Sequence, residues 1–462
     1  MRDYTKQSFM IAAVVAGGLF LLSSIPEGQV GSVFIKQIDI LSDIRRADKG
    51  SELFELVVEQ VDTVEKKIDT VQITPAERIV FVNNPTITKI EDFSDGEGPS
   101  MKDFYQTLAY ESQKRVVRVA MLGDSFIEGD IVSADLREQL QDIYNGCGVG
   151  FVPFASAVTQ YRKTIKHYFN GWDAYTNLTT GELPNDIKGR FFISCQLAVP
   201  LPGAKTTYEG VDLYQHIKSS TTASLLFVNE RKSAIHLTIN DTIVQRFTPE
   251  SSPLVQKICV EGSISKLSLR IDNPTGFYGY GVAFEDTLGV CVDNYSLRGN
   301  SGYTLKSTAQ SINRQIDSIR GYDLIILQYG LNVLSPKVRN YDYYTTNMTK
   351  VIEELQKQFP RCAILVMGIG DRGSMLNGEF VTMPAVYDLI KAQRNIAKES
   401  HVAFWSTFDA MGGAESMATF VKKGWAAKDY THLGYSGGKH IATSLVQAII
   451  NGKIDTLHDE IF

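Results

Sequence analysis

Short apolar runs that alternate with helical patterns restrict the fold of this chain more than any other feature. The runs are Val116–Leu122, Tyr322–Tyr329, Cys362–Ile369 and Val402–Phe408. The helical patterns are Met101–Lys114, which Ser100 can cap, then Tyr343–Gln358, Pro384–Glu399 and Tyr435–Ile450. Such an alternation predicts an α/β fold in which helices cover both faces of a parallel sheet.

A different pattern fills the stretch between about Gly150 and Asn294. Short β-branched or alternating runs are separated there by turn signals such as Asn-Asp and Asn-Pro. The runs are Ser224–Asn229, Ala234–Ile239, Val244–Thr248, Val255–Val260, Lys266–Ile271 and Tyr278–Phe284. Their spacing predicts an antiparallel β-sandwich that is inserted into the α/β domain. The α/β domain would then comprise residues 101–150 and 295–462, and the inserted domain residues 151–294.

Residues 1–26 have the pattern of an uncleaved signal anchor. Arg2 and Lys6 precede an apolar run from Phe9 to Ile25, close to the shortest length that spans a bilayer, and no Ala-x-Ala cleavage site follows. Positive charge before the run favours an orientation with the rest of the chain outside the cytoplasm. We expect a membrane-anchored, extracytoplasmic protein, in a bacterium one that faces the periplasm. The alternatives are a cleaved signal peptide and, less favoured, a buried helix. Residues 27–100 would form a stalk or accessory segment.

Composition excludes some classes of function. The formal net charge of −6 gives no electrostatic reason to bind nucleic acid. The five cysteines contain no Cys-x-x-Cys pair, and the histidines lack the spacing of metal ligands. We therefore expect no nucleic-acid partner, no metal and no cofactor.

Two short motifs together suggest a catalytic triad. Gly123-Asp124-Ser125 closes the first apolar run, at the end of a strand where open α/β sheets place their active sites. A serine hydroxyl becomes a nucleophile only when a base accepts its proton and a third group orients that base. Asp429-Tyr430-Thr431-His432 supplies both groups just before the last helix. Each motif alone is common in ordinary turns, but together they predict that Ser125, His432 and Asp429 meet.

Acyl transfer also needs hydrogen-bond donors for the developing oxyanion. Gly330-Leu331-Asn332 closes the run Tyr322–Tyr329, so the Asn332 amide is expected on the same rim of the sheet as Ser125. Gly299-Asn300-Ser301-Gly302 follows the expected β insertion, and a glycine lets a backbone N–H approach a substrate closely.

These four blocks, in this order, resemble the marker blocks of SGNH (GDSL-like) hydrolases. The resemblance covers about Arg115 to Ala448 without the insertion, and it implies a flavodoxin-like, three-layer fold. It also implies a set of site residues. These are the triad of Ser125, Asp429 and His432, and the oxyanion donors Ser125, Gly302 and Asn332, with Gly299 as the alternative to Gly302.

A narrower resemblance concerns Gly123–Asp130, Asp135-Leu136-Arg137 and Gly146–Pro153, which are similar to the opening of bacterial peptidoglycan O-acetylesterases. Those enzymes also carry a carbohydrate-binding-module-like β domain between the first and second blocks. One departure is Phe126, where many relatives have His. The resemblance implies a serine esterase that removes O-acetyl or other short acyl groups from a cell-envelope polysaccharide such as peptidoglycan. An O-acyltransferase with the same triad and a non-catalytic glycan-binding envelope protein remain alternatives.

Overall fold

The structure is a computed structural model, and it describes residues 87–459 except residues 97, 157, 159–160, 179–181 and 377. Strands β1 (Gly28–Val30) and β2 (Val33–Ile35) are also described and form a short antiparallel hairpin. This hairpin belongs to the unit Met1–Arg78, whereas Ile79–Phe462 forms a second compact unit.

The expected signal anchor at residues 1–26 lies outside the described residues, and so does most of the expected stalk at residues 27–100. In the part of the chain that the structure describes, each helix is too short or too polar to cross a bilayer. The anchor therefore stays a prediction from the sequence.

The second unit contains a six-stranded sheet with the order β14-β4-β15-β16-β19-β3. Its strands are β14 (Gly289–Ser296), β4 (Val116–Gly123), β15 (Leu324–Gln328), β16 (Ala363–Met367), β19 (Ala403–Trp405) and β3 (Glu91–Asp92). The first five are parallel, and β3 pairs antiparallel at the edge. If the five parallel strands are numbered as they occur along the chain, their order across the sheet is 2-1-3-4-5. This is the flavodoxin-like order. The direction of winding reverses at β4, and ligands bind at such a point in open α/β sheets.

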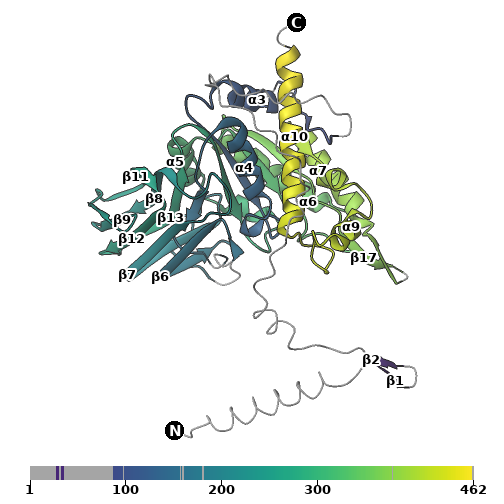
Figure 1. Cartoon of the computed structure of the whole chain (residues 1–462), viewed down its shortest axis with the longest axis horizontal. Coiled ribbons are helices and arrows are strands. Elements are labelled where there is room, and N and C mark those ends of the chain that lie inside the picture. Colours follow the sequence, from purple (N-terminus) through teal and green to yellow (C-terminus); the bar gives the residue numbers. More distant parts are fainter. Residues whose placement is uncertain are drawn as a thin grey trace, which may run out of the picture. The chain divides into compact units, whose positions relative to one another are not determined.

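Helices in two groups complete the α/β layers. They are α3 (Met101–Tyr110), α4 (Ser133–Tyr144), α5 (Gln310–Arg320), α6 (Asp342–Gln358), α7 (Ala385–Glu399), α8 (Thr407–Met411), α9 (Ser416–Lys422) and α10 (Tyr435–Asp459). Helix α10 packs against α3 and α4, and α6 packs against α5 and α7; α4 and α10 lie side by side in Figure 1. Every residue of β15 and β16 is buried, so both faces of the sheet are covered.

The helix expected after Ser100 shows how local sequence sets these elements. The Ser100 hydroxyl accepts the amide of Asp103 at 3.2 Å, and the Asp103 carboxylate accepts the amide of Ser100 at 2.8 Å. This reciprocal capping box satisfies two amides that the first helical turn cannot pair. The helix ends at Tyr110 rather than at the expected Lys114.

An antiparallel sheet of nine strands forms between β4 and β14 in the chain. Its strands are β5 (Gly150–Pro153), β6 (Ile165–Thr176), β7 (Gln196–Gly210), β8 (Ser220–Asn229), β9 (Ala234–Ile239), β10 (Ile243–Phe247), β11 (Ser252–Ile264), β12 (Lys266–Asp272) and β13 (Phe277–Glu285). All six strands expected from the sequence are present, and β5, β6 and β7 are additional. The sheet encloses its own apolar core, where Phe154 stacks on Trp172 with ring centroids 5.4 Å apart.

Two details differ from the expectation. The sequence predicts a sandwich of two sheets, but the strands form one continuous sheet because β7 pairs with β12 and also meets β13 at Ala198. The expected insertion ended at Asn294, yet β14 pairs in parallel with β4 along its whole length. Residues 289–294 therefore belong to the parallel sheet, and the rest of the domain division stays a prediction.

A buried ionic network joins the two sheets. Glu285, the last residue of β13, accepts hydrogen bonds from Arg118 of β4 at 2.9 and 3.0 Å and from Arg320 of α5 at 3.2 Å. Arg320 also binds Asp293 of β14 at 2.7 Å. Burial raises the pKa of Glu285, but Arg320 and Arg118 outweigh it and lower that pKa to about 2. Its carboxylate therefore stabilises the fold above the ordinary carboxyl pKa, and this contribution is lost as the pH falls toward 2.

We expect Glu285→Ala to lower the free energy of unfolding by about 3–5 kcal/mol, because it leaves the buried guanidinium of Arg320 and the partly buried one of Arg118 without their shared partner. Urea unfolding followed by circular dichroism measures this change. The control is Glu209→Ala, which removes an exposed ion pair with Lys166 and should change the midpoint far less. Equal midpoints for the two variants would contradict the prediction.

Candidate active site

Ser125 lies in the turn that follows β4. A Cβ at Gly123 would lie 2.8 Å from the carbonyl oxygen of Gln328, so only glycine fits where β4 runs beside β15. The Asp124 carboxylate accepts the Phe126 amide at 2.9 Å and closes the turn. The structure thus places Ser125 at the carboxyl end of β4, where the sequence analysis expects it.

The hydroxyl of Ser125 meets the ring of His432, although 307 positions separate the two residues. Ser125 Oγ lies 3.1 Å from His432 Nε2, and His432 Nδ1 lies 2.7 Å from Asp429 Oδ2. The structure therefore brings the three expected side chains into one hydrogen-bonded chain. In this arrangement the imidazole can accept the serine proton at Nε2 while the carboxylate holds the hydrogen on Nδ1.

Asp429 also shapes the loop that carries His432. Its Oδ1 accepts the backbone amides of Thr431 at 2.9 Å and of His432 at 3.0 Å. Burial raises the pKa of Asp429, but the hydrogen bonds from the His432 ring and from these two amides outweigh burial and lower it. The carboxylate is therefore held in its charged form, which is the form that favours an imidazolium next to it.

Asn332 follows β15 and reaches the turn of the nucleophile. Its Nδ2 donates to Asp124 Oδ2 and to the carbonyl oxygen of Asn300, each at 2.9 Å. Asp124 is fully buried, and this burial raises its pKa to about 7 against the opposing effects of the Phe126 amide, His432 and Asn332. The sequence analysis expected Asn332 on this rim, and the structure places it there beside the residue that precedes Ser125.

Gly302 lies at the start of the 3₁₀ helix η4 (Tyr303–Ser307), with a left-handed φ of 90°. A Cβ there would lie 2.7 Å from Met348 Sδ, so the position requires glycine on two grounds. Its amide, the expected second oxyanion donor, donates to Asn300 Oδ1 at 2.8 Å. At Gly299, the alternative donor, a Cβ would meet nothing within 4 Å. In this structure the Gly302 amide is therefore already hydrogen-bonded to the Asn300 side chain.

Asn300 is the residue here that the sequence analysis did not single out. It is buried, its side chain accepts the Gly302 amide and the Thr304 hydroxyl, and its carbonyl oxygen accepts Asn332. An Asn between two glycines is a typical turn signal, so the sequence contained a cue for the turn but not for its partners.

Comparison with known proteins gives a match only among solved structures. No family model and no curated protein matches the chain. A structure of a peptidoglycan O-acetylesterase aligns over 79% of this chain and 99% of its own length, with 21% identity and a TM-score of 0.65. The chain therefore shares the fold of that peptidoglycan O-acetylesterase. At this level of identity the likeness is one of fold.

Two further solved structures overlap with this chain too loosely to strengthen the comparison. An acetylxylan esterase from Geobacillus stearothermophilus aligns over 35% of this chain and 73% of its own length, with 18% identity and a TM-score of 0.26. A family two carbohydrate esterase from Cellvibrio japonicus aligns over 62% and 99%, with 9% identity and a TM-score of 0.25.

A β-hairpin supports the loop that carries Asp429 and His432, here called the triad loop. Strands β17 (Gly373–Leu376) and β18 (Glu379–Thr382) form the hairpin, and the Phe380 ring stacks on Tyr430 with centroids 3.6 Å apart. The Gly373 amide also donates to the Tyr430 carbonyl at 3.1 Å. Tyr430, between Asp429 and His432, has a positive φ of 53°, which costs energy in a residue other than glycine. The hairpin therefore holds a strained residue between two members of the triad.

Ser125 and His432 open into a cleft of about 270 Å³. The other residues that line the cleft come from four separate segments of the chain. They are Glu128, Ile131, Tyr161, Lys163, Arg298 and Tyr435. The sequence analysis assigned no role to these residues, because they share no spacing and lie on loops or at element ends.

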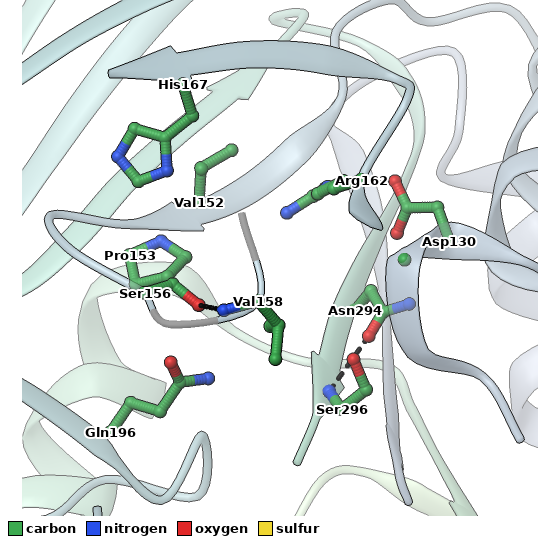
Figure 2. Close-up of a pocket in the computed structure, with 11 residues that line it drawn as sticks. Asp130, Val152, Pro153, Ser156, Val158, Arg162, His167, Gln196, Asn294 and Ser296 are labelled. Carbon is green, nitrogen blue, oxygen red and sulfur yellow. Dashed lines mark hydrogen bonds and ion pairs between the residues drawn. The ribbon is translucent and has the colours of Figure 1, made fainter. Parts of the chain in front are cut away.

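Buried ion pairs hold the loop that carries Glu128 and Ile131, which lines one side of this cleft. Asp130, in the short helix η2 (Glu128–Asp130), binds Arg162 at 3.0 Å and Arg137 at 3.4 Å. Burial raises the pKa of Asp130, but Arg162 and Arg137 outweigh it and hold it well below its ordinary value. Figure 2 shows Arg162 and Asp130 as neighbours in the lining of a cavity of about 30 Å³. The segment before β6 thus ties the antiparallel sheet to the loop of the nucleophile.

One group among the described residues has the composition of a metal site. The ligand atoms of Glu138, Asp142 and His216 lie within 4.8 Å of one another. The group includes no residue of the cleft, and His216 Nδ1 lies 3.2 Å from Glu138 Oε1 as an ordinary partner.

Proposed function

We propose that this chain is a serine esterase that removes O-acetyl or other short acyl groups from a cell-envelope polysaccharide, with peptidoglycan as the first candidate. The observation that carries the proposal is the hydrogen-bonded chain from Ser125 through His432 to Asp429, which opens into the cleft. The fold shared with a peptidoglycan O-acetylesterase supports it. The acetylated glycan is then the substrate, and no cofactor takes part.

The reaction proceeds in two steps. His432 Nε2 accepts the proton of Ser125 as Oγ attacks the ester carbonyl, and the imidazolium then gives this proton to the departing sugar oxygen. Water, deprotonated by His432, attacks the acyl-serine, and the carboxylic acid leaves as the serine hydroxyl is restored. Asp429 stabilises the imidazolium in both steps.

The oxyanion is held by the amide of Ser125 together with Gly302 and Asn332. In the structure these last two groups donate to Asn300 and Asp124. They become donors to the oxyanion when the substrate oxygen replaces one of these acceptors. Donors that are already in place are the largest contribution to acyl transfer in sites of this kind.

We also propose that residues 1–26 anchor the enzyme in a membrane with its body outside the cytoplasm. Arg2 and Lys6 before the apolar run support this orientation. A substrate in the cell envelope would be accessible to an enzyme in this orientation.

Release of acetate by the purified full-length protein tests the proposed function. The substrates are O-acetylated peptidoglycan, acetylated xylan and 4-nitrophenyl acetate, and free acetate is measured enzymatically. We expect free acetate from at least one of the two glycans. No release from any of the three would overturn the esterase assignment, and acetyl groups recovered on an acceptor sugar would show transfer instead of hydrolysis.

Phe380→Ala should lower kcat about 10-fold with little change in KM, because a small displacement of a catalytic group is costly while the cleft itself remains. The variant removes the ring that stacks on Tyr430. Steady-state hydrolysis of 4-nitrophenyl acetate measures both constants. Tyr387→Ala, which removes a half-exposed aromatic contact with Phe408, is the matched control. A wild-type kcat in Phe380→Ala would show that the hairpin does not position the triad loop.

A further inference from the structure

The cleft beside Ser125 contains two cations that ester hydrolysis does not use. Arg298 and Lys163 both line it, in a protein whose formal net charge is −6. Acyl transfer needs a base and oxyanion donors, and the residues assigned above supply both. Both side chains are therefore placed where they can contact a bound substrate.

The two cations differ in how far they are neutralised. Arg298 donates to the buried carboxylate of Glu128, with Nε 3.0 Å from Oε2. For Lys163, no ion pair occurs within the described part of the chain, and its side chain is exposed. The charged side chains that line the cleft are the cations Arg298 and Lys163 and the carboxylate Glu128. Arg298 pairs with Glu128, so the unbalanced positive charge is that of Lys163. In an acidic protein such a local charge attracts anions to the site.

Aromatic rings hold both cations in place. Lys163 Nζ lies 4.6 Å from the centre of the Tyr435 ring, and Arg298 Cζ lies 5.6 Å from that of Tyr161. Tyr435 is itself fixed, because its hydroxyl donates to the carbonyl oxygens of Gly129 at 3.1 Å and Tyr161 at 2.9 Å. A cation that is already positioned loses less entropy when it binds an anion.

We propose that Lys163, on the Tyr435 ring, forms a subsite for a carboxylate of the substrate, so that the preferred substrate is a short-acyl ester on an acidic sugar. This inference rests on the proposed esterase function. The carboxylate can belong to the sugar ring itself, as in a uronic acid, or to an ether substituent, as in a lactyl group. A neutral acetylated sugar would fit the same cleft without using Lys163.

Two matched substrate pairs test the subsite in the full-length protein. One pair is 6-O-acetyl-N-acetylmuramic acid and its carboxamide, and the other is the methyl glycoside of 3-O-acetylglucuronic acid and its carboxamide. Within each pair only the charge differs. We expect kcat/KM to favour the acid about 5-fold in at least one pair, and this ratio to fall toward 1 in Lys163→Gln and at high salt. The pair that shows the ratio identifies the source of the carboxylate.

Lys166→Gln is the matched control, because Lys166 is exposed on the neighbouring strand β6, pairs with Glu209 and does not line the cleft. It should keep the wild-type ratio. If 4-nitrophenyl acetate is hydrolysed, the esterase function holds. A ratio near 1 for both pairs in the wild-type protein, or an unchanged ratio in Lys163→Gln, would then overturn the subsite alone.

A binding measurement separates failure of the subsite from failure of the esterase assignment. Calorimetric titration of Ser125→Ala with N-acetylmuramic acid and glucuronic acid, and with the carboxamide of each, does not require turnover. We expect at least one acid to bind more tightly than its carboxamide and Lys163→Gln to abolish the difference. Equal affinities within both pairs would overturn the subsite whatever the esterase assay shows.

Discussion

Replacing Ser125 by alanine should reduce turnover of an acetyl ester by at least about 1,000-fold while the protein stays folded. In the proposed mechanism the Ser125 hydroxyl forms the acyl intermediate, and without it water must attack the ester directly, which is far slower. The side chain is small, partly buried and opens into the cleft, so its loss leaves no cavity in the core. Hydrolysis of 4-nitrophenyl acetate measures the change, and circular dichroism checks the fold.

A labelling experiment provides the control for this variant. A fluorophosphonate probe should label the wild-type protein at Ser125, because its phosphorus accepts an activated serine oxygen, and it should not label Ser125→Ala. Wild-type-like hydrolysis by the alanine variant would remove Ser125 from the mechanism. A folded wild-type protein that the probe never labels would favour a non-catalytic glycan-binding protein.

Replacing His432 by glutamine should lower kcat by about 1,000-fold or more, because the base that accepts the serine proton is lost. Glutamine retains hydrogen-bonding capacity near Ser125 and Asp429, so the loop is expected to stay in place. His401→Gln, which changes a half-exposed histidine that pairs weakly with Asp95, should leave kcat unchanged.

The double variant makes this prediction sharper. Groups that act as one unit are not additive, so Ser125→Ala combined with His432→Gln should be little slower than either single variant. Independent effects that multiply in the double variant would contradict a Ser–His pair. Asp429→Asn should cost less than either, because it affects only the orientation and charge of the imidazole.

Local pattern was sufficient to predict ten of the nineteen strands and four of the eight α-helices that the structure describes. Buried parallel strands such as β15 have only apolar residues, and the helices that follow keep one apolar stripe, so both are visible in a short window. Strands β6 and β7 escaped detection because Gly171, Pro200 and Pro202 interrupt them and their exposed positions do not alternate regularly. Strand β14 was not among the expected strands, and its residues 289–294 fell within the expected insertion because an all-buried strand has the same pattern in either sheet.

The sequence by itself determined where the residues of the candidate site lie, because Ser125, Asn332 and His432 each follow a strand or precede a helix whose end the local pattern reveals. The carboxyl ends of parallel strands lie along one edge of the sheet, so the positions of these residues could be inferred without coordinates. Only the tertiary structure decided which acceptor the Gly302 amide binds and which side chains line the cleft. Those contacts join loops that are distant in the chain, and the path of such a loop depends on the packing of its surroundings rather than on its own residues.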